Sequence, residues 1–332
     1  MGKYCERIHK LLQYIYIVMN RDVGLDIVKG IAIIAVVFGH CTLFPYHTFI
    51  YSFHMPLFFI VAGYLYKKKA INYSFKKDVS RLVLPYIVFS LIRSLKFTIT
   101  KVIENDWSYV KSVWMDMLYG NVCSIYGEIK IYSTILWFLL ALFVCKNCYN
   151  ILNHNIKSKR KLYIIAGGIS LVITVFANYI IILPWGLSTG GSAMIFYVIG
   201  NIAKNRSFSR YAIVPLVLLW WIGIAYSQID MYTCHYNLYP VDVLGACGAT
   251  WLMYILAKWI SKKESIINTG LSWMGRYSLI VLCMHFMVQL LDLNSRINTN
   301  SWISYLLIDF AQIIPLTYIC TKIRVTKLLF QV

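Results

Sequence analysis

Three ionisable residues lie within the first long apolar stretch of the sequence. Asp26, Lys29 and His40 occur in LDIVKGIAIIAVVFGH. On a helix turning 100° per residue, Lys29 lies about 20° and Asp26 about 40° from the direction of His40. Lys29 and His40 are separated by roughly 16 Å along the axis. A single histidine or lysine here could be a packing or interface residue, but three on one stripe of an apolar helix favour function. The stripe predicts His40 as a general base, with Asp26 holding Lys29 near the cytoplasmic boundary.

Further polar residues occur in later apolar stretches. Ser52 and His54 open the second stretch, SFHMPLFFIVAGYLY, and should enter the membrane beside His40. Arg93 lies in the third stretch and needs an anionic partner there, either a carboxylate or a bound ligand. For His285 and Asp309, in the last two stretches, the sequence by itself favours a structural role.

Several kinds of chemistry have no motif in this sequence. It contains no GxSxG, P-loop or HExxH pattern, which argues against a serine hydrolase, an ATPase or a zinc protease. Cys145 and Cys148 form one CxxC, but no second pair completes a metal site, so we expect no bound metal. What remains is a histidine as general base without an obvious protein nucleophile.

The composition shows what kind of scaffold holds these residues. The 332 residues are 59% apolar and 14% charged, with a mean hydropathy of +0.64. Soluble domains are roughly 45–50% apolar and about 25% charged. The apolar residues form many runs near the roughly 20 residues that cross a bilayer. The sequence therefore predicts an all-α, polytopic integral membrane protein with about ten transmembrane helices. The expected spans are 24–45, 48–66, 82–100, 134–152, 162–183, 188–203, 211–228, 240–260, 277–293 and 302–321.

The basic residues predict the orientation of these spans. One set of alternate connections, together with both termini, holds 25 Lys and Arg, whereas the other set holds 4. Cytoplasmic connections carry the excess of Lys and Arg, so both termini are expected to be cytoplasmic. Because the net charge of +19 is concentrated in these clusters, we expect an anionic lipid surface or a phosphorylated ligand, and no nucleic acid.

Two segments outside the spans have distinct expected roles. The longest outer connection, 101–133, is long enough to cover an outward-facing site. Residues 1–21 carry apolar side chains at helical spacing among Lys and Arg, which predicts an amphipathic helix on the cytoplasmic surface. The expected organisation is this surface helix followed by one transmembrane domain over 22–332.

Short motifs in order along the chain resemble a known family. They are Asp26-Ile27-Val28-Lys29 with His40, Phe53-His54-Met55-Pro56-Leu57-Phe58-Phe59, Ala62-Gly63-Tyr64-Leu65, Leu136-Trp137-Phe138-Leu139, Gly200, and Gly275-Arg276-Tyr277-Ser278-Leu279 leading to His285. Together they resemble the membrane-bound acyltransferase 3 family, in particular its branch similar to fucose 4-O-acetylases and O-antigen O-acetyltransferases. Two departures from the family pattern are Lys29, where many members have Arg, and Ala62, where a serine is common.

The resemblance implies an activity, a donor and an acceptor. The family transfers an acyl group, usually acetyl, from cytosolic acyl-CoA to a hydroxyl of a cell-surface or lipid-linked glycan. It implies that Lys29 and His40 form the family's basic-residue-then-histidine motif. We expect Lys29, Arg81 and Arg93 to bind acetyl-CoA, and Asp26 and His54 to assist His40. Ser52, Trp137 and His285 are the expected substrate contacts.

Other interpretations of these features stay open at this stage. His40 could deprotonate the acceptor directly or carry the acyl group covalently. A transporter or flippase of a glycan or lipid would also have many spans and buried ionisable residues, and a non-catalytic partner in glycan assembly is a further alternative. The expected location is the inner membrane of a bacterial cell, with the lipid bilayer as a partner. The sequence does not indicate an oligomeric state.

Overall fold

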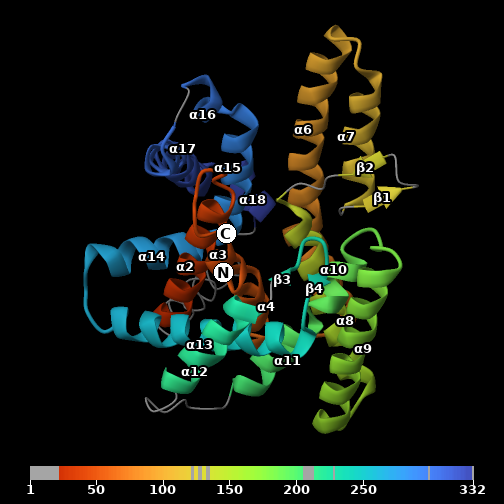
Figure 1. Ribbon diagram of the computed structural model, residues 1–332, viewed down its shortest axis with the longest axis vertical. Helices are drawn as coiled ribbons and strands as arrows, with labels where there is room; N and C mark the ends of the chain where they lie inside the picture. The colour runs from red at the N-terminus through yellow and green to blue at the C-terminus, as the bar shows by residue number, and fades with distance from the viewer. Residues whose placement is uncertain are drawn as a thin grey trace, which may run out of the picture.

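The computed structural model describes residues 22–120, 123–125, 129–131, 135–204, 213–226, 229–297 and 300–330 (Figure 1). The surface helix predicted for 1–21 lies outside these ranges. The described part consists mainly of helices, with short antiparallel hairpins β1–β2 and β3–β4. This agrees with the predicted helical class.

The elements follow one another along the chain with short connections. The first half contains α2 (Val23–Gly39), α3 (His47–Tyr51), α4 (His54–Tyr64), α5 (Ile71–Asp78), the π-helix η1 (Val79–Val83), α6 (Leu84–Ile103), α7 (Trp107–Tyr119), β1 (Cys123–Ile125), β2 (Ile129–Ile131) and α8 (Trp137–Asn155). The second half contains α9 (Lys159–Tyr179), α10 (Leu187–Ser192), α11 (Met194–Ala203), α12 (Ile213–Tyr226), β3 (Ile229–Asp230), β4 (His235–Tyr236), α13 (Tyr239–Ile260), α14 (Ile266–Arg276), α15 (Ser278–Leu291), α16 (Leu293–Arg296), α17 (Trp302–Lys322) and α18 (Arg324–Phe330).

Each predicted span coincides with a helix or with two consecutive helices. Among the described residues, four continuous helices are long and apolar enough to cross a bilayer: Ile71–Ile103, Lys159–Tyr179, Tyr239–Ile260 and Trp302–Lys322. A fifth candidate is the pair α14 and α15, which is bent by 82°. The described residues thus include four or five candidate membrane-spanning helices, while the full set of ten spans and the side on which each terminus lies stay predictions.

Interruptions in the helices fall close to the residues that the sequence singled out. The second predicted span is divided between α3 and α4, with Ser52 and Phe53 at the break. The ninth begins at Tyr277, where α14 and α15 meet at the sharp bend. Helix breaks expose backbone groups and turn side chains inward, and in membrane proteins they are tolerated where they are buried in protein or line a cavity.

Glycines allow the helices around α2 and α4 to touch through their backbones. A Cβ on Gly275 in α14 would overlap the carbonyl oxygen of Asp26, and a Cβ on Gly30 would overlap that of Leu271. Gly63 and Gly200 hold α4 against α11 in the same reciprocal way. Without a hydrophobic driving force between helices in lipid, such close packing is a main source of association. These contacts fix α2 and α4 firmly in the bundle.

The predicted connection 101–133 contains a further helix. Asp106 accepts a hydrogen bond from the Tyr109 backbone N–H at 3.0 Å and so caps α7, while Gly120, at a φ of +70°, ends it. In Figure 1, α6 and α7 form a hairpin that projects beyond the neighbouring helices. Of the described residues in this connection, none lines the cavity that Lys29 and His40 line, so they give no support to the expectation that it covers a site.

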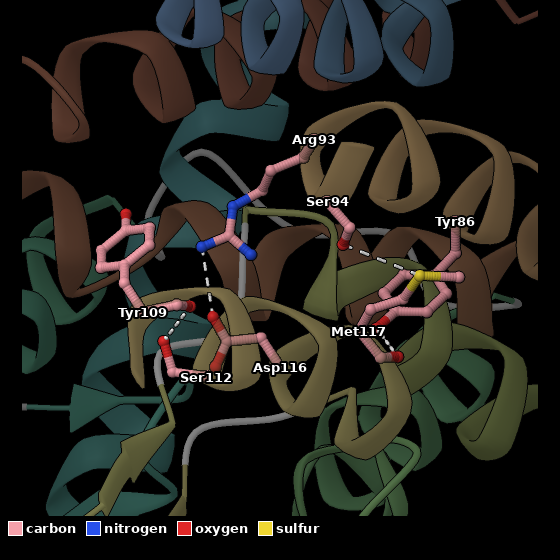
Figure 2. A network of polar contacts seen from close by, with 7 residues as sticks. All are labelled: Tyr86, Arg93, Ser94, Tyr109, Ser112, Asp116 and Met117. Carbon is pink, nitrogen blue, oxygen red and sulfur yellow. Dashed lines mark hydrogen bonds and ion pairs between the residues drawn. The ribbon is translucent and has the colours of Figure 1, made fainter. Parts of the chain in front are cut away.

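Arg93 holds this hairpin together. Its Nη2 lies 3.1 Å from Oδ2 of Asp116, and Figure 2 shows the guanidinium of α6 pointing at the carboxylate of α7. Both side chains are largely buried. Of the two partners that the sequence allowed for Arg93, a carboxylate or a bound ligand, the structure provides the carboxylate.

Candidate active site

One cavity of about 720 Å³ lies at the centre of the bundle. Its walls come from α2, α4, the α5–η1 segment, α8, the β3–β4 hairpin, the α14–α15 bend and α18. Small-molecule sites in proteins commonly have volumes of about 300–1,000 Å³. The cavity is therefore large enough for an extended ligand of cofactor size.

Seven basic side chains belong to the described lining of this cavity. They are Lys29, Lys67, Lys69, Lys77, Arg81, Lys146 and Arg276. Most of them belong to connections that the charge count assigns to the cytoplasmic side. The described lining contains two carboxylates, Asp78 and Asp230, and Asp78 is buried and paired with Lys146 at 2.5 Å. The surplus of cations suits a ligand that carries several phosphates.

Lys29 and His40 both line the cavity, as expected from their shared stripe on α2. Lys29 Nζ lies 2.7 Å from Oδ1 of the buried Asp26, one helical turn earlier. Asp26 is not part of the described lining, and its contribution to the cavity is to hold the Lys29 ammonium group. The ion pair fixes the direction of the ammonium group.

The imidazole of His40 is held in a defined orientation. His40 follows the last residue of α2, and its Nδ1 lies 2.7 Å from the carbonyl oxygen of Val36. A carbonyl only accepts hydrogen bonds, so Nδ1 carries the proton of the neutral ring and Nε2 keeps a lone pair. A neutral histidine with a free Nε2 beside a cavity has the form that a general base requires.

His54 repeats this arrangement on α4. Its Nδ1 lies 2.8 Å from the carbonyl oxygen of Ile50, so its Nε2 is likewise the unprotonated nitrogen. His54 lines the same cavity as His40, in agreement with the prediction that it enters beside that residue. The ring centroid of Tyr51 lies 5.3 Å from that of His54, and Tyr51 donates a hydrogen bond to the Gly39 carbonyl at 2.8 Å. Through Tyr51, the start of α4 is tied to the end of α2.

The other predicted site residues lie at different distances from the cavity. Trp137 and Arg81 line it. Ser52 accepts a hydrogen bond from Trp220 Nε1 at 2.8 Å and lines a separate, smaller cavity. His285 is fully buried behind His40, outside the lining. Arg93 is paired with Asp116 in the α6–α7 hairpin and does not reach the cavity.

Several lining residues were not singled out from the sequence. Tyr51 lies near the start of the predicted span 48–66, Asp230 lies in an outer connection, and Lys146 is one of the basic residues of a cytoplasmic connection. Nothing local in the sequence brings these segments together. Asp230 carried one usable signal, since it is acidic in an outer connection that contains no Lys or Arg.

Cys234, in the β3–β4 hairpin, is not available as a nucleophile. Its side chain is fully buried, 3.9 Å from Ser192 Oγ. Burial raises the pKa of the Cys234 thiol to about 12. Because the thiolate is the reactive form, this cysteine is inert at neutral pH. Cys234 therefore supplies no nucleophile to the cavity that this hairpin lines.

Comparison with known proteins identifies the family. Residues 22–321 match the family model described as an acyltransferase domain. Nodulation protein NolL of Sinorhizobium fredii is 38% identical over 23% of this chain and 26% of its own length. NolL of Mesorhizobium japonicum is 37% identical over 23% of this chain and 25% of its own length. The chain thus spans about a quarter of the curated relatives it matches. No solved structure matches. Because the family model covers most of the chain, the protein belongs to this acyltransferase family.

Proposed function

We propose that this acyltransferase moves an acyl group, most simply acetyl, from cytosolic acyl-CoA to a hydroxyl of a cell-surface or lipid-linked glycan at a bacterial inner membrane. One observation carries the proposal: a single cavity is lined by seven basic side chains and also by two histidines whose Nε2 atoms are unprotonated. A phosphate-bearing donor and a proton-accepting group can therefore meet in one enclosed space.

The basic part of the lining suits the nucleotide of CoA. Arg81 and Arg276 can each offer a forked pair of N–H donors to a phosphate, and Lys67, Lys69 and Lys77 add point charges. The narrow pantetheine arm would then follow the wall of α2 from Lys29 towards His40. Lys29 and His40 are separated by roughly 16 Å along the helix, a length that an extended pantetheine can cover. The thioester would lie beside the two histidines.

The proposed reaction is a direct acyl transfer. Nε2 of His40 takes the proton of the acceptor hydroxyl as its oxygen attacks the thioester carbonyl carbon, forming the C–O bond. The C–S bond then breaks, and the CoA sulfur leaves with the proton from His40. His54, whose Nε2 faces the same cavity, supplies a second polar contact for the reacting groups. Asp26 holds Lys29 in place for the donor.

The test uses the whole protein in isolated membranes with radiolabelled acetyl-CoA and a glycan extract from the cells that carry the gene. We expect label in the glycan and release of free CoA. His40→Ala should reduce this rate by about 10²–10⁴-fold, the usual contribution of a general base. The matched control is His154→Gln, because His154 is half-buried and outside the cavity lining, and glutamine keeps an N–H that can reach the Lys69 carbonyl as His154 Nε2 does.

Two results would contradict the proposal. One is an unchanged rate in a His40→Ala variant whose melting temperature and membrane level equal those of the parent. The other is translocation of the glycan without any incorporation of label, which would indicate the transporter alternative.

A further inference from the structure

A second, smaller cavity of about 320 Å³ adjoins the first. Its polar lining comes from three places: His47, Thr48 and Ser52 around α3, Asp230, Thr233 and His235 in the β3–β4 hairpin, and Asp242 at the start of α13. No Lys or Arg is part of the described lining. This cavity therefore has the opposite charge character from the basic part of the larger one.

The two cavities share a thin wall. Tyr51, Ile229 and Asp230 line both of them. On the larger side, this wall faces the space that His40 and His54 also line. A hydroxyl reaching past the wall from the smaller cavity would therefore come to the histidines.

Asp230 is held so that one carboxylate oxygen stays available. Its Oδ1 accepts a hydrogen bond from the Tyr232 backbone N–H at 2.9 Å. Among the residues that the structure describes, none donates a hydrogen bond to Oδ2. An ionised carboxylate oxygen can accept hydrogen bonds from hydroxyl groups but repels phosphates and other carboxylates.

The smaller cavity takes its lining from different connections than those that supply the basic residues of the larger cavity. Apart from the residues of α12 and α13, its lining comes from 46–52 and 229–239, two connections that the charge count assigns to the outer side. The larger cavity takes most of its basic residues from connections assigned to the cytoplasmic side. The two cavities thus take polar lining residues from opposite predicted sides and share Tyr51 and Asp230.

We propose that the smaller cavity binds the acceptor as a non-anionic sugar unit, with Asp230 accepting hydrogen bonds from its hydroxyls and directing one hydroxyl past Tyr51 to His40. This rests on the proposed function. The cavity is about the size of a small-ligand site, and its hydroxyl, imidazole and carboxylate groups match the hydrogen bonds of a saccharide. The absence of Lys and Arg from the described lining disfavours an anionic acceptor.

The first experiment blocks the smaller cavity. Thr48 is exposed and lines it, so we would introduce Thr48→Cys and label the purified protein with a bulky sulfonated maleimide. Thr100→Cys is the matched control, because Thr100 is exposed at the far end of α6, which is also assigned to the outer side. The parent protein, treated in the same way, corrects for native cysteines. Binding of radiolabelled acetyl-CoA and transfer of label to the glycan extract are measured before and after labelling.

We expect maleimide modification of Thr48→Cys to lower acetyl transfer at least about tenfold, because the attached group fills the space proposed for the acceptor. Binding of acetyl-CoA should stay within twofold. Labelled Thr100→Cys should behave like the labelled parent. Normal transfer by labelled Thr48→Cys would overturn the inference. Absence of transfer in the unlabelled parent would instead defeat the proposed function, so the two failures are distinguishable.

The second experiment separates the two substrates kinetically. Asp230→Asn should raise the extract concentration that gives half the maximal rate by about tenfold, because a hydrogen bond to a charged group is lost. The KM for acetyl-CoA should stay within twofold. Asp106→Asn is the control, since asparagine also caps a helix. If Asp230→Asn changed the half-maximal concentrations of both substrates equally, or changed neither, the proposed role of Asp230 would be contradicted.

Discussion

The imidazoles of His40 and His285 lie with their ring centroids 5.4 Å apart, one from α2 and the other from α15. The Gln289 side-chain N–H lies 3.3 Å from Nε2 of His285, which leaves the ring proton on Nδ1. That nitrogen faces Oδ2 of Asp309 at 3.9 Å, just beyond hydrogen-bonding distance. His40 is thus supported on the side away from the cavity by a second histidine that points at a carboxylate.

His285→Gln should therefore slow transfer without abolishing it. His285 touches His40 but not the cavity, so we expect a positioning residue and a loss of about tenfold in kcat, smaller than for His40→Ala. The KM for acetyl-CoA should be unchanged. A purely structural role would lower the melting temperature and the amount of folded protein while leaving kcat per folded molecule equal to that of the parent.

Arg81→Gln should weaken donor binding selectively. Arg81 lines the basic part of the cavity, and loss of one forked contact to a phosphate should raise the KM for acetyl-CoA by about tenfold with little effect on kcat. Salt should raise the KM of the parent more than that of the variant, because the variant has lost one charge contact. Lys101→Gln is the control, since Lys101 pairs with Glu104 at the far end of α6. An equal increase in KM for both variants would contradict a specific donor contact.

Arg93→Met should destabilise the protein while leaving donor affinity unchanged. It removes one partner of a largely buried ion pair and leaves Asp116 with a buried charge, at a cost of about 3–5 kcal/mol. The double variant Arg93→Met with Asp116→Leu should recover much of this loss. Thermal unfolding in detergent and the KM for acetyl-CoA are the two measurements. A large rise in KM with unchanged stability would return Arg93 to the donor-binding role first expected for it.

Replacing two glycines of α14 with alanine should have different effects on the stability of the protein. In Gly275→Ala the new methyl group would overlap the backbone of α2, and we expect a loss of about 3 kcal/mol or more in stability. At Gly270 nothing lies within 4 Å of the added atom, so Gly270→Ala should be neutral or stabilising by up to about 1 kcal/mol. Thermal unfolding of both variants distinguishes close helix packing from a general intolerance of substitution in α14.

The two adjoining cavities predict the kinetic mechanism. Since donor and acceptor can occupy separate spaces at once, initial rates should follow a sequential mechanism, with intersecting double-reciprocal plots. Without acceptor, label should not exchange between acetyl-CoA and free CoA. Exchange as fast as transfer would instead show that an acyl-enzyme intermediate forms, with His40 as the first candidate to carry it.

Local patterns predicted the positions of the apolar helices and the stripe on α2, because hydropathy and helical geometry depend on neighbouring residues only. The same reasoning missed α7, although Asp106 and Gly120 mark its two ends. A mixed polar segment between two apolar spans predicts a connection rather than a helix.

The cavity was harder to predict from local patterns. Its lining joins Lys146, Asp230 and Arg276, residues from three separate regions of the sequence that helix packing brings together. The breaks at Ser52 and Tyr277 likewise depend on packing against neighbouring helices. The sequence consequently indicated His40 as the reactive group, but not the second cavity beside it.

The backbone contact of α2 with α14 has a consequence for how the protein is made. A ribosome completes the N-terminal α2 long before it reaches Gly275, and chains fold as they are synthesised. Until then, the face of α2 around Gly30 must be covered by lipid or by the insertion machinery. A nascent chain stopped before α14 would hold His40 in the membrane on a helix without its closest neighbour. Competence for acyl transfer should therefore arise only after α14 has been made and has packed against α2.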